Sequence, residues 1–252
     1  MYAYYHIFLW NRILYSKLIF KIAQSIALSL NPIQISGFAE NDKCCILNSK
    51  LFLMEIKNPL ILNLSKVISN FFNPLVSLVI YFFYYSYKNY TWEEASKKFL
   101  PILLLLIIPV ALWIYRNVKN GNYTNMDVSN RKQRYSLYIF IIIATVIFLA
   151  VDFYLHKEMD WAIFMLCILL ILMQISNFFI KSSMHTSLNI YVSALFFTIE
   201  PVIGIFWFFL SILIGITRVI LKRHTPKEVL SGGTIAVFVS LIYLTMVNAI
   251  IF

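Results

Sequence analysis

The sequence predicts an all-α protein, a polytopic membrane helix bundle with about six to seven transmembrane helices. Three observations lead to this fold class. Of the 252 residues, 61% are hydrophobic and only 13% are charged, whereas a soluble domain carries roughly a quarter charged residues. Apolar runs of about 20 residues, the length that crosses a bilayer, recur along the chain. The polar and basic residues gather in short loops between these runs.

Seven apolar segments are candidates for the membrane spans. We expect them at 68–88, 98–117, 135–154, 161–181, 186–199, 202–221 and 229–251. The pair Glu200–Pro201 divides the long apolar stretch 186–221. A proline disfavours helical geometry in the residue before it, and a carboxylate prefers an interface to the bilayer interior. We therefore expect two separate helices on either side of this pair.

The first part of the chain differs from these spans. Residues 1–53 mix aromatic, aliphatic and basic side chains without an uninterrupted apolar run, as an interfacial amphipathic helix does. Met54 then opens a segment that reads like a natural protein start, so we expect the first 53 residues to be an upstream extension. The predicted organisation is an N-terminal extension over 1–57 followed by one membrane domain over 58–252.

The charge balance favours some partners over others. A net charge of +10 suits contact with a lipid bilayer that carries anionic headgroups, or with phosphorylated substrates. It does not predict nucleic-acid binding, because the basic residues are scattered over short loops and do not follow one polar face. Cys44, Cys45 and Cys167 lack metal-ligand spacing. The sequence therefore predicts neither a metal nor another cofactor.

Three polar loops stand out between the expected spans. They are "KNGNYTNMDVSNRKQRYS" at 119–136, "KSSMHTS" at 181–187 and "TRVILKRHTPKEVLSGG" at 217–233. Two expected spans separate each loop from the next, so the chain returns to the same membrane face each time. We therefore expect all three loops to meet at one surface.

Each loop also has an ordinary structural explanation. Basic residues such as those in "SNRKQR" commonly anchor a helix end at the membrane interface. Ser182 or Ser183 fits a helix N-cap. Thr225, Pro226 and Glu228 fit a capping box with proline at the first helical position. Helix capping and anchoring do not require the histidines of the second and third loops.

Taken together, the loops supply the groups that bind and transfer phosphate. They hold cations, two imidazoles, a carboxylate and expected helix N-termini. Phosphoryl transfer depends mainly on positioning and on neutralising the charge that develops on phosphate oxygens. Arginine is the preferred bidentate partner of phosphate.

The same loops resemble the three motifs of the type 2 phosphatidic acid phosphatase superfamily. "SSMHTS" is similar to its Pro-Ser-Gly-His motif. The third loop is similar to its Ser-Arg-x5-His-x3-Asp motif, since Arg218 lies six residues before His224 and Glu228 four residues after it. "NRKQRYSLY" resembles the first motif, in which a lysine is followed seven residues later by Arg-Pro.

The chain departs from these motifs at several positions. Thr217 replaces serine and Glu228 replaces aspartate in the third loop, and Ser182 and Met184 replace proline and glycine in the second. In the first loop, Tyr135 follows Arg134 where the family has proline. Asp127 stands where the family has lysine, so that Arg131 or Lys132 would have to supply the missing cation.

The resemblance implies an integral membrane phosphatase that hydrolyses a lipid phosphomonoester or a polyprenyl diphosphate through a phosphohistidine intermediate, without a metal. It implies that His224 is the nucleophile, that His185 is the general acid and that Glu228 orients the nucleophile. The implied phosphate-binding residues are Arg218, Arg134, Arg131, Lys132 and Ser183.

Two alternatives stay open. One is a lipid-binding membrane protein on the same fold that has lost the chemistry at the departing positions. The other is a small transporter, for which the spans offer few polar residues, mainly Gln174 and Asn177. We expect the plasma or inner membrane of a bacterium. The excess of basic residues beside the three loops favours the cytoplasmic face for the site.

Overall fold

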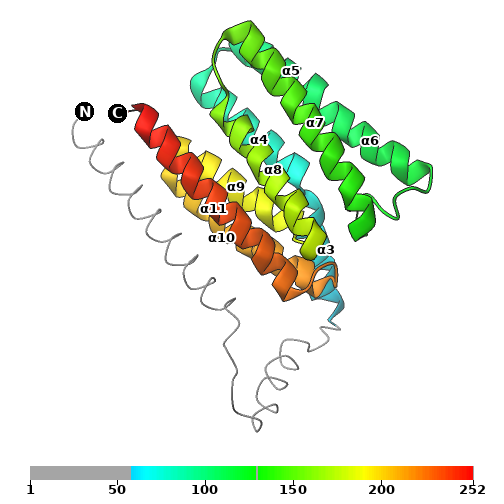
Figure 1. The fold of residues 1–252 in the computed structure, drawn as a ribbon. Coiled ribbons are helices and arrows are strands. Elements are labelled where there is room, and N and C mark those ends of the chain that lie inside the picture. The colour runs from blue at the N-terminus through cyan, green and yellow to red at the C-terminus, as the bar shows by residue number, and fades with distance from the viewer. Residues whose placement is uncertain (1–57, 129, 252) are drawn as a thin grey trace, which may run out of the picture.

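The computed structural model describes residues 58–128 and 130–251, and these residues form helices and loops without a β-strand. The predicted extensions over 1–53 and 1–57 lie outside the described residues. The helices in chain order are α3 (Pro59–Phe71), α4 (Pro74–Asn89), α5 (Trp92–Ile102), the π-helix η1 (Leu103–Ile107), α6 (Ile108–Lys119), α7 (Arg131–His156), α8 (Trp161–Phe179), α9 (Met184–Ile199), α10 (Pro201–Ile220) and α11 (Pro226–Ile251). The predicted all-α bundle is confirmed (Figure 1).

Side-chain caps and prolines determine where most of these helices begin. The capping side chains, each accepting a hydrogen bond from a backbone N–H of the first turn, are Asn58, Asn73, Thr91, Asn130, Asp160 and Ser183. Proline opens α3, α4, α10 and α11, where its missing N–H costs nothing. The predicted break at Glu200–Pro201 is confirmed, because α9 ends at Ile199 and α10 begins at Pro201.

The length and apolar character of the helices make this an integral membrane protein. In the part of the chain that the structure describes, five helices are long and apolar enough to cross a bilayer: Trp92–Lys119, Arg131–His156, Trp161–Phe179, Pro201–Ile220 and Pro226–Val247. The expected first span is bent, since α3 and α4 meet at 56° across a short break. The expected span 186–199 corresponds to α9, which has 16 residues and is shorter than its neighbours α8 and α10.

Helix α9 forms the centre of the bundle (Figure 1). Every residue from His185 to Phe197 is buried, against α4, α8, α10 and α11. Gly204 allows α10 to cross very close to α9, since a Cβ there would lie 2.5 Å from the Cα of Phe197. The loop that leads into the first turn of α9 is therefore held by the best-packed part of the protein.

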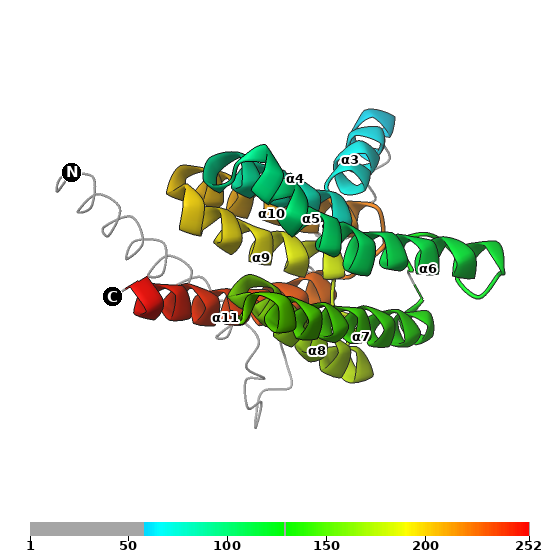
Figure 2. The ribbon, with the colours of Figure 1, turned by 90° about the horizontal axis from the view of Figure 1, so that it is seen from above.

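Helices α5, η1 and α6 form one continuous rod along the side of the bundle (Figure 2). Pro109 lacks the N–H that an α-helix would need there. The preceding turn widens, so that Ile108 N–H donates to the Leu103 carbonyl, five residues back. Val110 is the one fully buried residue described in this rod. The rod therefore covers the bundle without joining its core.

Candidate functional site

The three polar loops meet at one end of the bundle. Arg134 in the first turn of α7, His185 in the first turn of α9 and Arg218 in the last turn of α10 are all buried. His224, in the loop between α10 and α11, is also buried, and Glu228 lies in the first turn of α11. The structure thus brings together residues that are up to 94 positions apart in the sequence, counted from Arg134 to Glu228.

His224 is held between a carboxylate and a guanidinium. Its Nδ1 lies 2.8 Å from Glu228 Oε2, and its Nε2 lies 3.2 Å from Arg134 Nη2. Because a guanidinium can only donate, Nε2 must be the acceptor, so that the proton of the neutral ring is on Nδ1 and is donated to Glu228. The lone pair of Nε2 consequently points towards a cation.

The Glu228 carboxylate caps α11 and orients His224 at the same time. Its Oε2 accepts the Thr225 backbone N–H at 3.2 Å, and Thr225 Oγ1 accepts the Glu228 N–H at 3.3 Å. The predicted capping box is confirmed. The same Oε2 atom also accepts the hydrogen bond from the imidazole of His224, so one carboxylate oxygen serves both functions.

Burial keeps both histidines of the site neutral. Burial is the largest cause that lowers the pKa of His224, to about 2, and the nearby Arg134 cation lowers it further. The pKa of His185 is lowered to about 3 by burial and by Arg218, although Asp127 acts in the opposite direction. Both rings are therefore uncharged near neutral pH.

Arg134 and Arg218 differ in how fully their donors are used. Arg134 donates from Nε to the Val128 carbonyl at 2.9 Å and from Nη1 to the Ser182 carbonyl at 2.8 Å, in addition to its contact with His224. Arg218 uses Nη1 alone, which lies 2.8 Å from Ser69 Oγ and 3.0 Å from Asp127 Oδ2.

Buried donors without a partner remain around Arg218. Among the described residues, Arg218 Nε and Nη2 and His185 Nε2 have no hydrogen-bond partner. Burying unpaired polar groups of this kind is costly, and a cationic one more so. Such groups mark a place where an anion can bind and satisfy them.

Ser183 and Gly232 fix the contact between α9 and α11. The Ser183 N–H donates to the Glu228 carbonyl at 3.0 Å, and Ser183 Oγ accepts from Thr186 Oγ1 at 3.0 Å. A Cβ on Gly232 would lie 2.6 Å from Ser187 Oγ and 2.9 Å from the Ser183 carbonyl oxygen, so only glycine permits this approach. Ser183 therefore acts as the N-cap of α9 and sets its position against α11.

The structure does not bring Arg131 and Lys132 to this group. Arg131 Nε donates to the Asn177 carbonyl at 2.7 Å, and Nη2 donates to the Phe178 carbonyl, so that Arg131 satisfies the C-terminal end of α8. Lys132 is exposed. The guanidinium of Arg131 is therefore occupied by carbonyls of α8, and Lys132 lies at the surface.

Lys181 supplies a cation that sequence reasoning missed. Its Nζ lies 3.9 Å from Glu228 Oε2 and 3.1 Å from the Arg223 carbonyl. Burial lowers the pKa of Lys181, and Glu228 acts against that change. Lys181 belongs to the loop "KSSMHTS", and its position just ahead of the predicted N-cap was the available signal.

Asp127 and Ser69 also lie in the site without having been predicted there. Asp127 contacts Arg218 and lies 3.8 Å from His185 Nε2, measured from Oδ1. Its spacing of seven residues before Arg134 was the signal in the sequence. Ser69 comes from α3, outside the three loops, and nothing in the local sequence distinguishes it.

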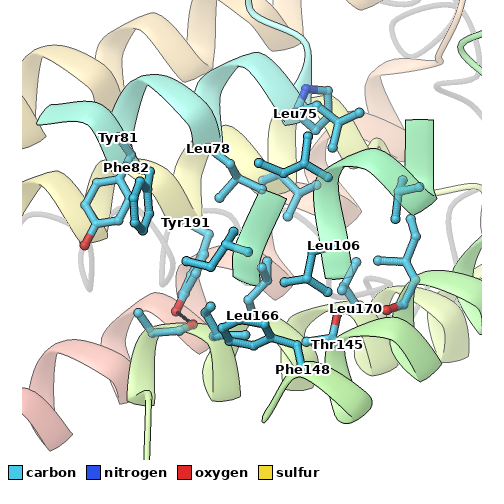
Figure 3. Close-up of a pocket in the computed structure, with 18 of the residues that line it drawn as sticks. Leu75, Leu78, Tyr81, Phe82, Leu106, Thr145, Phe148, Leu166, Leu170 and Tyr191 are labelled. Atoms are coloured by element: carbon cyan, nitrogen blue, oxygen red, sulfur yellow. Dashed lines mark hydrogen bonds between the residues drawn. The ribbon is translucent and has the colours of Figure 1, made fainter. Parts of the chain in front are cut away.

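A cavity of about 680 Å³ extends from this site between the helices. Its polar end is lined by Asp127, Arg134 and His185, and it continues past apolar side chains to Tyr90 and Asp160. Figure 3 shows the apolar part, where the side chains of Leu78, Leu106, Leu166 and Leu170 face the same space. Size and lining both fit a small-molecule site.

Comparison with known proteins adds no assignment. No family model matches the chain, and the search found no matching curated protein and no matching solved structure. Within the described residues, no group of three or more His, Cys, Asp and Glu side chains could hold a metal ion. The arrangement itself offers an oriented imidazole, a second neutral imidazole and two buried guanidinium groups beside an apolar cavity.

Proposed function

We propose that this protein is a membrane-embedded phosphatase that removes phosphate from an amphiphilic phosphomonoester or a polyprenyl diphosphate by way of a phosphohistidine. The observation that carries the proposal is the geometry of His224. Its Nδ1 proton is committed to Glu228 at 2.8 Å, while its Nε2 lone pair faces the Arg134 guanidinium. A nucleophile oriented by a carboxylate and aimed at a phosphate-binding cation is the arrangement that covalent phosphoryl transfer needs.

In the first step, a phosphate oxygen takes the Arg134 N–H that now contacts His224, which frees Nε2 to attack phosphorus. A bond forms between Nε2 and phosphorus, and the bond from phosphorus to the lipid oxygen breaks. Glu228 stabilises the positive charge that the ring then carries. Arg218, with two unpaired donors, binds the charge that develops on the phosphate oxygens.

His185 is placed to exchange the proton with the leaving group. It is neutral in the unliganded protein, but a phosphate dianion beside it raises its pKa, because a nearby opposite charge favours the cation. His185 then protonates the lipid oxygen as the bond to phosphorus breaks. In the second step, it accepts a proton from the water that attacks phosphorus, and the bond between phosphorus and Nε2 breaks.

The cavity supports an amphiphilic substrate. Its polar end lies at Arg134 and His185, and its apolar part continues between α4, η1, α7 and α8. A phosphate bound at the polar end would leave its acyl or isoprenoid chain in the apolar part. The location within a membrane bundle makes a lipid phosphate a better fit than a soluble sugar phosphate.

The test is phosphate release by purified protein from phosphatidic acid and from undecaprenyl diphosphate, in the presence of EDTA. Wild type is expected to release phosphate, and His224→Ala is expected to lose all measurable release. Lys97→Ala is the control. It removes a basic side chain whose Nζ lies 2.7 Å from Glu93 Oε1 on the surface of α5, outside both the site and the cavity lining.

The outcomes separate the proposal from its alternatives. Release that survives EDTA and disappears in His224→Ala supports the phosphohistidine mechanism. Equal release by wild type and His224→Ala would exclude His224 as the nucleophile. If wild type binds lipid phosphates without releasing phosphate, the protein is a lipid-binding scaffold and the hydrolase proposal fails.

A further inference from the structure

The Asp127 carboxylate lies inside the predicted phosphate site. Its Oδ2 is 3.0 Å from Arg218 Nη1, and its Oδ1 is 3.8 Å from His185 Nε2. Both partners are residues that would contact a bound phosphate. A carboxylate with two oxygens between a guanidinium and an imidazole occupies the space that two phosphate oxygens would occupy.

Asp127 is negatively charged in this position. Burial is the largest single cause and raises the pKa of Asp127, but the charge of Arg218, its hydrogen bond to the carboxylate and the charge of other nearby basic groups together lower the pKa below its ordinary value. Two phosphate oxygens cannot share this space with an ionised carboxylate, because like charges at such distances repel strongly. Phosphate and Asp127 therefore compete for Arg218.

Asp127 also separates the cavity from the groups behind it. Among the described residues, the cavity lining includes Asp127, Arg134 and His185 but neither Arg218 nor His224. The His224 side chain is completely buried, and that of Arg218 is 1% exposed, whereas 26% of the Asp127 side chain is exposed. A phosphate that arrives through the cavity meets the carboxylate before it meets Arg218.

The site has more donors than Asp127 uses. Arg218 Nε and Nη2 and His185 Nε2 stay without a partner while Asp127 is in place. A tetrahedral phosphate offers more acceptor oxygens than a carboxylate and could satisfy these donors as well. The internal carboxylate is thus an incomplete occupant of the site.

The loop that carries Asp127 is held under strain. Val128 has φ 45°, a left-handed conformation that is an outlier for a β-branched residue. Its carbonyl is held by Arg134 Nε at 2.9 Å. Arg134 is also expected to bind phosphate, through the Nη2 that now contacts His224, so one guanidinium holds the strained loop and faces the arriving anion.

We propose that Asp127 is a specificity-determining residue, whose carboxylate occupies the phosphate position in the unliganded protein and is displaced when phosphate enters. The proposal rests on the proposed function. Opening the loop costs free energy. The apparent affinity for phosphate therefore equals the intrinsic affinity multiplied by the fraction of molecules in which the loop is open. Weakly held anions are excluded, and only a phosphate that satisfies the spare donors of Arg218 and His185 displaces the carboxylate.

The test measures the binding of orthovanadate, a phosphate analogue, to the detergent-solubilised full chain. Binding is followed by the rise in melting temperature as the vanadate concentration increases. Asp127→Asn and Asp127→Ser remove the charge in two different ways. Both are expected to bind vanadate about tenfold more tightly than wild type, the factor for a binding-competent state that is roughly one-tenth populated. The KM for the lipid phosphate should fall with them, without a loss in kcat.

Glu93→Gln is the matched control. It also removes a carboxylate paired with a cation, since Glu93 Oε1 lies 2.7 Å from Lys97 Nζ, but this pair is exposed on α5. Its vanadate affinity should equal that of wild type. Equal or weaker vanadate binding by both Asp127 variants, with wild type active, would overturn the inference and leave the proposed function intact. A fall in kcat at unchanged KM would make Asp127 a positioning residue for His185 and would also overturn it.

Hydrogen exchange on wild type tests the displacement without any variant. The Val128 N–H donates to the Asn125 carbonyl at 3.0 Å, and the Tyr123 N–H donates to the Asn117 carbonyl at 3.0 Å. Vanadate is expected to speed exchange in the segment 122–128 while it slows exchange around His224. Slower exchange in both segments would mean that the loop closes over the anion, against the inference. If vanadate does not bind and no phosphate is released, the proposed function fails together with it.

Discussion

The two walls of the cavity are built very differently. On one side, α10 and α11 pack around α9, and 44% of the most apolar 18-residue stretch of each of these two helices is buried. On the other side, only 6% of the most apolar 18-residue stretch of the rod from Trp92 to Lys119 is buried. His185, Arg218 and His224 belong to the tightly packed side, while Asp127 and Arg134 come from the loop and helix that follow the rod. Groups that need fixed geometry therefore lie on the rigid wall, and those that exchange partners lie on the other.

The largest effect is expected at Glu228, where the rigid wall carries chemistry. Glu228→Gln keeps a side chain that can cap α11 but no longer fixes the proton on His224 Nδ1 or stabilises the charged ring. We expect kcat to fall by about 10³-fold or more, with little change in melting temperature. A steady-state assay beside a thermal melt checks this. If Glu228→Gln instead loses its cooperative melting transition, Glu228 is mainly a structural cap.

A second test adds one methyl group where α11 meets α9. In Gly232→Ala, the Cβ would lie 2.6 Å from Ser187 Oγ and 2.9 Å from the Ser183 carbonyl oxygen, so the helices must separate. We expect a loss of about 1–3 kcal/mol in stability together with lower activity. Gly233→Ala is the neighbouring control, because its nearest contact would be an ordinary 3.6 Å from Ile190. Equal melting temperatures for the two variants would show that the contact can relax.

Leucine truncations compare the two walls directly. Leu195 on α9 is 3% exposed, whereas Leu104 on η1 is 51% exposed. Leu195→Ala is expected to cost about 2 kcal/mol or more through the void it leaves, and Leu104→Ala less than about 0.5 kcal/mol. Denaturant or thermal unfolding in one detergent gives both values. Similar losses would mean that the rod is part of the cooperative core.

Stability is also expected to depend on pH. The pKa values of His224 and His185 are lowered to about 2 and about 3 in the folded protein, below the value near 6.5 of the unfolded chain. The unfolded state therefore binds more protons below pH 6.5, so stability is complete above that pH and is lost as the pH falls.

Each histidine contributes about 1.4 kcal/mol per pH unit below pH 6.5. Melting temperatures measured from pH 7.5 to pH 5 check this slope, and His224→Asn should flatten it by about half. A melting temperature that increases as the pH falls would show that the rings are protonated in the folded protein.

The features that sequence reasoning predicted are those encoded locally. The apolar runs, the break at Glu200–Pro201, the capping box at Thr225 and the return of three loops to one face all follow from neighbouring residues or from counting spans. The resemblance to the third motif likewise implied that His224 and Glu228, four residues apart, are partners, and their side chains are in contact.

The remaining contacts could not be predicted because they join distant segments. The charge of Arg131 suggested a phosphate ligand, but the direction of its side chain is decided by the unpaired carbonyls at the end of α8. Ser69 reaches Arg218 from α3, 149 residues away. Asp127 was visible as a departure from the motif, but its place between Arg218 and His185 depends on the left-handed turn at Val128.

The shortness of α9 has a consequence for the lipids around the protein. Its 16 residues rise about 24 Å, while the hydrocarbon core of a bilayer is about 30 Å thick. Because α9 is buried inside the bundle and its neighbours α8 and α10 are longer, its first turn would lie below the level of the headgroups, and a headgroup must sink below its usual height to reach it. This adjustment has an elastic cost that increases with bilayer thickness. Bilayer thickness would then control access to the site, with faster turnover expected in thin membranes than in thick ones.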